Sequence, residues 1–257
     1  EQSGVAAEYI LYNLSKLNQV EKLNELVKDK TIAKLVSDQV IMAYKMFTFM
    51  KLDRVKDALK VYEKNRAGLA KPIHQSILFN AAEGYFRLAK YDKGLKLFDD
   101  FVSNYSHLNR AGDARLRIAQ IYELTERDFE KTVELYKNAI NRSSDELTSY
   151  EARIRYVAMS NLRKKEITEK DKELRVLLDL EQRKIQSNLN QNLKKTLWLV
   201  RLRSFIVDHK FQEGLSYLKA IPINTLKPTE RRVFKGDGAE IVYGLMLDAY
   251  KKSDYGQ

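Results

Sequence analysis

The sequence has no cysteine, only three prolines and only ten glycines among its 257 residues. The absence of cysteine excludes disulfides, thiolate metal ligands and thiol nucleophiles, and it suits an oxidising or a reducing compartment equally. Proline and glycine both interrupt helices, so their scarcity leaves room for long helices, whereas a strand-rich domain would need more turn residues. No apolar run reaches the ~20 residues that a membrane-spanning helix requires.

Hydrophobic residues make up 44% of the chain and charged residues 32%, a balance typical of a folded protein rather than a disordered one. The formal net charge is +11, from 46 basic and 35 acidic residues. A basic excess favours acidic partners such as nucleic acid, anionic lipid or an acidic protein surface. Because no basic run is long, solubility through lysine-rich helix surfaces explains the same excess.

Apolar residues recur at helical spacing through most of the chain. Gly68 and Pro72 predict a break in this pattern. The stretch Lys235-Gly-Asp-Gly238 predicts a turn that ends a short basic helix. Short turns between helices favour antiparallel hairpins. The predicted helices cover residues 5–16, 20–28, 31–36, 40–52, 55–67, 76–88, 91–105, 111–124, 129–140, 145–166, 169–190, 193–208, 211–220, 230–234 and 239–252.

A repeat runs through the middle of this pattern. The small residues Ala58, Gly94 and Thr132 lie 36 and 38 positions apart, and an aromatic follows each of them four residues later. A small side chain is needed where the second helix of a hairpin crosses the first, because helix axes pack only ~8–10 Å apart. A fourth copy contains Trp198 and Gly214. The period therefore predicts stacked helix hairpins.

The second copy resembles the tetratricopeptide repeat, and Trp198 stands at that family's tryptophan position. No copy has the family's final proline. The resemblance covers roughly residues 40–140 and 195–221. It implies an all-α, right-handed α-solenoid of stacked antiparallel hairpins, to which we assign residues 1–221, followed by a C-terminal helical element over residues 222–257.

The lengthened repeats resemble those of bacterial envelope proteins, which favours a periplasmic or envelope-associated setting over a cytoplasmic one. The family positions in the second copy are Leu78, Ala82, Tyr85, Tyr91, Gly94 and Phe98.

A second resemblance concerns one copy only. Residues 54–62, followed by Gly68 and Pro72, resemble the pentatricopeptide repeat, whose members bind single-stranded RNA. Neither later copy has this Gly–Pro ending. An RNA-binding helical-repeat protein that uses its basic surface is therefore the alternative function.

The sequence offers little for catalysis. His74, His107 and His209 stand alone, apart from Glu213 four residues after His209, so no metal site is expected. There is no phosphate-binding glycine loop and no nucleophile-elbow motif. We therefore expect a non-enzyme that needs no cofactor.

The tetratricopeptide resemblance implies that the first helix of each hairpin lines a concave partner-binding face. The expected function is that of a non-catalytic scaffold or adaptor that binds another protein or peptide there. These positions are mostly apolar, which favours a helix or an extended segment as partner over a carboxylate tail. For Phe47 and Phe79, core packing is an equally open interpretation. The face comprises Ala43, Phe47, Met50, Phe79, Glu83, Phe86, Arg87, Leu116, Gln120 and Glu123.

Two further surfaces are candidates. The apolar stretch from Val5 to Leu14 could make a homo-dimer through a terminal repeat. A basic surface could meet acidic protein, nucleic acid or lipid headgroups. The acidic residues at 166–173 follow it closely, and favour a solvated helix face instead. This basic surface comprises Arg153, Arg155, Arg163, Lys164, Lys165, Arg201 and Arg203.

Overall fold

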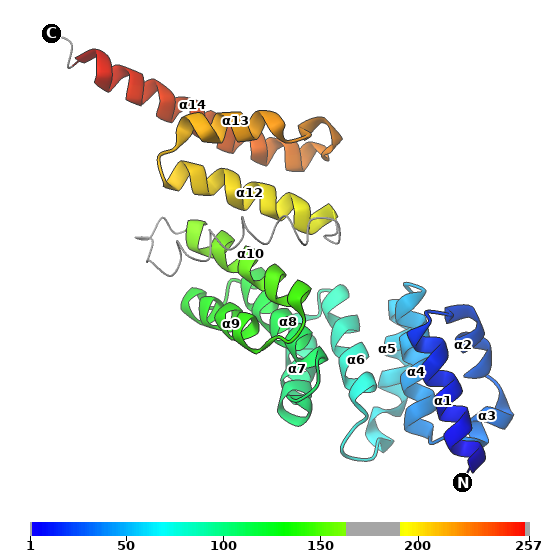
Figure 1. Cartoon of the computed structure of the whole chain (residues 1–257). Helices are drawn as coiled ribbons and strands as arrows, with labels where there is room; N and C mark the ends of the chain where they lie inside the picture. Colours follow the sequence, from blue (N-terminus) through cyan, green and yellow to red (C-terminus); the bar gives the residue numbers. More distant parts are fainter. Residues whose placement is uncertain (1, 163–190, 255–257) are drawn as a thin grey trace. The chain divides into compact units, whose positions relative to one another are not determined.

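The computed structural model describes residues 2–162 and 191–254, and these residues form helices and turns without a strand (Figure 1). The chain divides into two compact units, Glu1–Ser144 and Asp145–Gln257. The predicted all-α fold is confirmed.

The first unit is a series of helix hairpins. Helix α4 packs against α5 and α6, α6 against α7, α7 against α8, and α8 against α9, while α1 packs against α2 and α3. Each observed span lies close to the span that the hydrophobic periodicity predicts. The helices are α1 (Gln2–Lys16), α2 (Val20–Leu26), α3 (Lys30–Leu35), α4 (Asp38–Lys51), α5 (Val55–Asn65), α6 (Gln75–Arg87), α7 (Tyr91–Tyr105), α8 (Arg110–Leu124) and α9 (Phe129–Arg142).

The turns inside the hairpins share one backbone design. Each has a non-glycine residue with positive φ just after the first helix. The amide after that residue donates back to a carbonyl five positions earlier, as in Arg54 N to Phe49 O (2.8 Å) and Lys90 N to Tyr85 O (2.9 Å). This is the bond of a Schellman turn, which usually carries glycine at the left-handed position. The left-handed residues are Asn18, Asp53, Ala89, Glu126 and His209.

The small residues lie where the hairpin helices cross, as predicted. Ala58 and Thr132 are buried. A Cβ on Gly94 would lie 3.3 Å from the carbonyl oxygen of Ala82 and 3.4 Å from the amide nitrogen of Phe86, both backbone atoms of α6. Backbone cannot move aside cheaply, so the close approach of α7 to α6 requires a glycine here.

Most of the apolar core of the first unit lies in two clusters. The larger packs α4 to α8 around fully buried aromatic rings such as Phe98 and Phe101. The smaller lies beneath α1 to α3 and centres on Leu11 and Leu23. Helix α6 is central to the unit, because its residues 77–85 are buried without interruption.

The second unit contains α10 (Glu146–Leu162), α12 (Gln191–Val207), α13 (Phe211–Ala220) and α14 (Pro228–Asp254). Helix α12 packs against α10 and α13, and α14 packs against both α12 and α13. Its core is built around Leu202, Phe234 and Ile241. The predicted helix 169–190 and the end of the predicted helix 145–166 lie outside the described residues. The boundary expected at residue 221 stays a prediction.

The turn predicted at Lys235–Gly238 is wrong, because α14 runs through it without a break. Phe234 and Ile241, on either side of these glycines, are both buried in the core of the unit. A Cβ on Gly238 would come within 2.8 Å of the Leu218 side chain, so this glycine allows α14 to approach α13 closely. The burial of Phe234 and Ile241 therefore outweighs the ~1 kcal/mol by which Gly236 and Gly238 each destabilise a helix.

Candidate functional site

Helix α6 carries a carboxyl side chain within its buried stretch. Glu83 is 8% exposed, and the side chains that flank it on the helix belong to the core. Burying a carboxylate is costly unless partners compensate for the lost water. The partners of Glu83 therefore define the candidate site.

Two arginines hold this carboxylate. Arg117 on α8 donates from Nε to Glu83 Oε2 (2.9 Å) and from Nη2 to Glu83 Oε1 (3.2 Å), which is the strong two-point geometry of an arginine–carboxylate pair. Arg87, one turn further along α6, donates from Nε to Glu83 Oε1 (3.2 Å). The carboxylate thus joins α6 to α8, the first helices of two successive hairpins.

Arg117 is also fixed on its other sides. Its Nη1 donates to Gln120 Oε1 (2.7 Å), and its guanidinium lies 4.8 Å from the centre of the Phe86 ring. The Arg117 side chain is 30% exposed and the Arg87 side chain 43% exposed, so both cations reach the surface. A ring, an amide and a carboxylate therefore hold Arg117 in one orientation before any partner arrives.

A third arginine extends this surface. The guanidinium of Arg110, at the start of α8, lies 4.1 Å from the centre of the Phe79 ring. Burial lowers the pKa of Arg110, and the carboxylates of Asp113 and Glu83 oppose this shift. An arginine side chain remains charged at neutral pH even so. We call the six side chains the clamp surface: Glu83, Phe86, Arg87, Arg110, Arg117 and Gln120.

Four of the predicted face residues belong to the clamp surface, namely Glu83, Phe86, Arg87 and Gln120. The others lie elsewhere. Phe79 is 6% exposed and packs edge-on against Phe98 (5.8 Å between ring centres) and Phe101 (5.4 Å), so it is a core residue that offers one ring face to Arg110.

The three predicted α4 residues, Ala43, Phe47 and Met50, are also used for packing. Phe47 packs against the cluster beneath α1 to α3, with the Lys51 ammonium 5.5 Å from the centre of its ring. Met50 is buried in a small cluster with Val55 and Ala58. Ala43 and Leu116 are buried as well.

Glu123 has a structural partner inside its own hairpin. Its carboxylate accepts a hydrogen bond from the hydroxyl of Tyr136 on α9. The predicted face residues thus come together only along α6 and the middle of α8.

Sequence reasoning missed Arg110 and Arg117. A signal for Arg117 was present, because it lies 34 residues after Glu83, which is close to one repeat period. Other ion pairs of the described residues have the same spacing: Asp92 with Arg127, Lys195 with Glu230, and Arg203 with Asp237. A search for opposite charges 34 or 35 residues apart would have found all four.

The predicted basic surface is neutralised in part. Arg155 pairs with Glu151 (2.9 Å), Arg203 pairs with Asp237 (2.9 Å), and the Arg201 guanidinium lies 5.6 Å from the centre of the Tyr217 ring. Arg153 is half-buried on α10. These pairings weaken the field that an acidic partner would meet. Arg163, Lys164 and Lys165 lie outside the described residues.

Other chemistry finds little support in the described residues. His74 caps α6, because its Nδ1 accepts a hydrogen bond from the Ser76 amide (3.2 Å). Residues 2–162 and 191–254 contain no cluster of three or more side chains that could bind a metal ion. None of the helices described in those ranges is long and apolar enough to cross a membrane.

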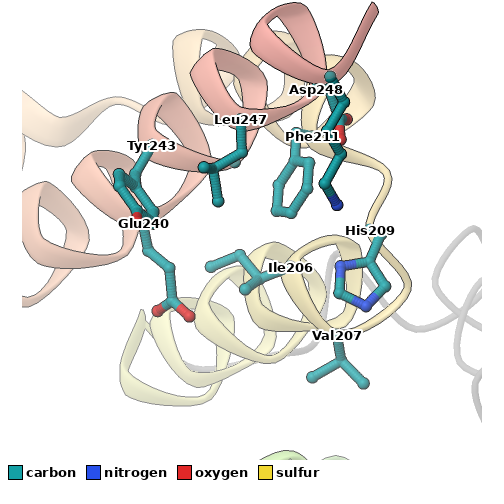
Figure 2. Close-up of a pocket in the computed structure, with 10 residues that line it drawn as sticks. Ile206, Val207, His209, Phe211, Glu240, Tyr243, Leu247 and Asp248 are labelled. Atoms are coloured by element: carbon teal, nitrogen blue, oxygen red, sulfur yellow. The ribbon is translucent and has the colours of Figure 1, made fainter. Parts of the chain in front are cut away.

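The second unit contains a cavity of about 350 Å³ beside α14. Figure 2 shows Leu247 of α14, Phe211 of α13 and Ile206 of α12 as its apolar lining, with His209 from the turn before α13. The charged side chains of Glu240, Asp248 and Lys251 line it too. The cavity offers apolar walls with charges of both signs and no arrangement of a nucleophile beside a base.

Comparisons with known proteins support the fold. No model of a known protein family matches the sequence, and no curated protein matches it. Among solved structures, the MamA RS-1 ArsTM double mutant is 16% identical, with a TM-score of 0.54 over 73% of this chain and 98% of that one. MamA MSR-1 C2 is 13% identical, with a TM-score of 0.52 over 70% and 99%. A tetratricopeptide repeat protein from Parabacteroides merdae is 12% identical, with a TM-score of 0.45 over 94% and 100%. The two likenesses with TM-scores above 0.5 confirm the predicted all-α fold of stacked helix hairpins.

Proposed function

We propose that this protein is a non-catalytic interaction scaffold that binds a segment of another protein at the clamp surface. The observation that carries the proposal is the Glu83–Arg117 pair. A buried ion pair contributes little net stability and often less than apolar residues of the same volume. A pair that links two hairpins, with two arginines reaching the surface beside it, is better explained by the binding of a partner.

The charges of the clamp surface indicate the chemistry of that partner. The six clamp-surface side chains include three arginines and one glutamate, and the Asp113 carboxylate beside Arg110 reduces their formal charge from +2 to +1. Arg87 also pairs with Asp53 (3.7 Å), but the Asp53 side chain is 90% exposed and this contact is screened by water. An acidic side chain of the partner would therefore gain from the cations, and an apolar one would pack on Phe86.

The alternative, an RNA-binding repeat protein, has less support. Binding of single strands usually combines cations with aromatic rings on which bases stack. The clamp surface contains a single half-exposed ring, Phe86, where stacking of successive bases would need several, and two of the arginines predicted for the basic surface are ion-paired. The envelope-associated setting that the long repeats favour stays a prediction.

The test is a comparison of two arginine variants in a pull-down from an extract of the source organism. Arg117→Ala removes an ion pair one repeat apart and an arginine–aromatic contact from the clamp surface. Arg127→Ala removes the same two kinds of contact elsewhere, from Asp92 and from the Tyr122 ring at 5.8 Å. We expect Arg117→Ala and Phe86→Ala to lose a protein that the wild type and Arg127→Ala retain.

The mode of binding is then tested with the captured segment. The affinity of this segment should fall when its acidic side chains are replaced by amides. The carboxylates are the groups expected to form charged hydrogen bonds with the arginines. Equal retention by all variants, or capture that nuclease abolishes, would contradict the proposal. The second result would favour RNA, which should also dissociate steeply as salt is raised.

A further inference from the structure

Helix α14 is apolar on two opposite faces. One face, with Phe234 and Ile241, is buried against α12 and α13. The opposite face is exposed: Tyr243 is 62% exposed, Met246 65% and Tyr250 66%. A surface helix normally carries polar residues opposite its buried face, and an apolar patch left exposed marks an interaction site. We call this face the outer stripe: Ala239, Val242, Tyr243, Met246, Leu247 and Tyr250.

We propose that the outer stripe binds the outer stripe of a second copy of this chain, with the two α14 helices antiparallel. The choice of occupant rests on two charges. Glu240 and Lys251 are both exposed and lie eleven residues apart. Eleven residues are just over three turns of 3.6 residues, so both side chains lie along the same edge of the outer stripe.

Two-fold symmetry makes this edge complementary to itself. In an antiparallel pair related by a two-fold axis, a residue faces the position equally far from the axis on the other helix. An axis that passes midway between Leu245 and Met246 places Glu240 of each copy opposite Lys251 of the other. Two ion pairs then close one edge of the interface. In a parallel pair, a two-fold axis would instead place Glu240 and Lys251 of the two copies on opposite edges of the interface, where neither ion pair could form.

The same axis lets the apolar side chains alternate. Met246 lies next to the axis and therefore meets Met246 of the second copy. Tyr243 lies 2.5 residues from the axis and Tyr250 lies 4.5 residues from it on the other side, so the tyrosines of the two copies occupy successive layers. Such interdigitation is how helices pack with axes ~8–10 Å apart.

The surroundings of the stripe leave space for this packing. A cavity of about 500 Å³ borders it on the side of Val242 and Met246, with Leu215 and Leu218 of α13 behind. Tyr250 of the second copy would lie level with Ile241, beside this cavity. The cavity in Figure 2 borders the stripe near Leu247, on the edge that carries Glu240 and Lys251.

A single helix pair is a small interface, so the dimer should be weak, with a dissociation constant on the order of tens of micromolar. Sedimentation across a wide concentration range should show a mass that rises from the 30.0 kDa monomer toward twice that value. Met246→Glu should remain monomeric. Leu124→Glu is the control, because Leu124 is an exposed (54%) apolar residue on α8 that belongs neither to the outer stripe nor to the stretch from Val5 to Leu14.

Charge exchange tests the antiparallel register. Glu240→Lys and Lys251→Glu should each weaken the dimer about tenfold, because each places like charges together twice. The double variant restores opposite charges across the axis and should recover dimerisation. Thermal unfolding of each variant separates a weakened dimer from a destabilised monomer.

Cross-linking tests the position of the axis. The chain has no cysteine, so Met246→Cys introduces a single thiol, which should form a disulfide between two copies under mild oxidation. Val233→Cys is the control on the same helix, since its two thiols would lie ~37 Å apart along the axis.

Three outcomes would overturn the proposal: a monomer at every concentration, a double charge variant that does not recover, or equal cross-linking at positions 233 and 246. A monomer whose outer stripe is needed to capture a different protein would assign the surface to that protein instead.

Discussion

Replacing Glu83 by glutamine should lower the free energy of unfolding of the first unit by about 2 kcal/mol. Removing one member of a buried ion pair costs about 3–5 kcal/mol, because the other charge stays buried without compensation. The arginines here are 30% and 43% exposed and can recover water, so the lower figure is expected. A loss of 2 kcal/mol corresponds to a fall in Tm of roughly 6 °C for a unit of this size.

A double-mutant cycle isolates the interaction itself. Glu83→Gln, Arg117→Met and the double variant are unfolded with urea, and the coupling energy should be about 1–2 kcal/mol. Asp92→Asn with Arg127→Met serves as the matched cycle. Its carboxylate side chain is 88% exposed, so its coupling should be at most a few tenths of a kcal/mol. Equal coupling in the two cycles would refute the argument from burial.

Three other predictions test the architecture. Ala89→Gly should stabilise the first unit by about 0.5–1 kcal/mol, because Ala89 is held at a φ of 55° that glycine adopts without strain. Gly94→Ala should destabilise it by at least 1 kcal/mol by pressing on the α6 backbone, whereas Gly68→Ala, with no neighbouring atom within 4 Å, should not; urea unfolding compares the two. Burial lowers the pKa of His74, so the folded state prefers neutral imidazole and should lose stability as the pH falls through and below the ordinary value near 6.5. His74→Asn, which can still cap α6, should remove that pH dependence from the Tm; a wild-type Tm that does not fall between pH 7 and pH 5 would contradict it.

The hairpins were predictable because their signals are local. Helical periodicity identified the helices, and the spacing of Ala58, Gly94 and Thr132 identified the crossings where bulk is excluded. The same local view failed at Gly236 and Gly238, where glycines inside a helix look like a turn. There the burial of Phe234 and Ile241 against other helices decides the conformation, and a sequence does not display that contact.

The binding face was harder to predict than the fold because α6 is buried on most sides. Family positions place Phe79 and Phe86 on one face of a helix, but the structure buries the first against Phe98 and Phe101 and leaves the second half-exposed. Phe79 and Phe86, which the family pattern places on the same face, thus have different roles. Which one remains accessible depends on the neighbouring hairpins.

Opposite charges one repeat period apart indicate how successive hairpins stack, which apolar positions do not. Apolar packing between hairpins tolerates small shifts, whereas an ion pair between residues 34 or 35 apart forms only when successive hairpins stack in register. Two of these four pairs, Asp92 with Arg127 and Lys195 with Glu230, have both side chains at least 22% exposed, where the desolvation penalty is small. The carboxylates of Glu83 and Asp237 lie deeper, at 10% and 14% exposed, and Glu83 also holds a second arginine in place, which register alone would not require. The need to hold Arg117 and Arg87 rigidly toward a partner would, since a cation fixed before binding loses less conformational entropy when the partner arrives. A partner that binds the Arg117→Ala variant as tightly as the wild type would remove this reason for the buried carboxylate.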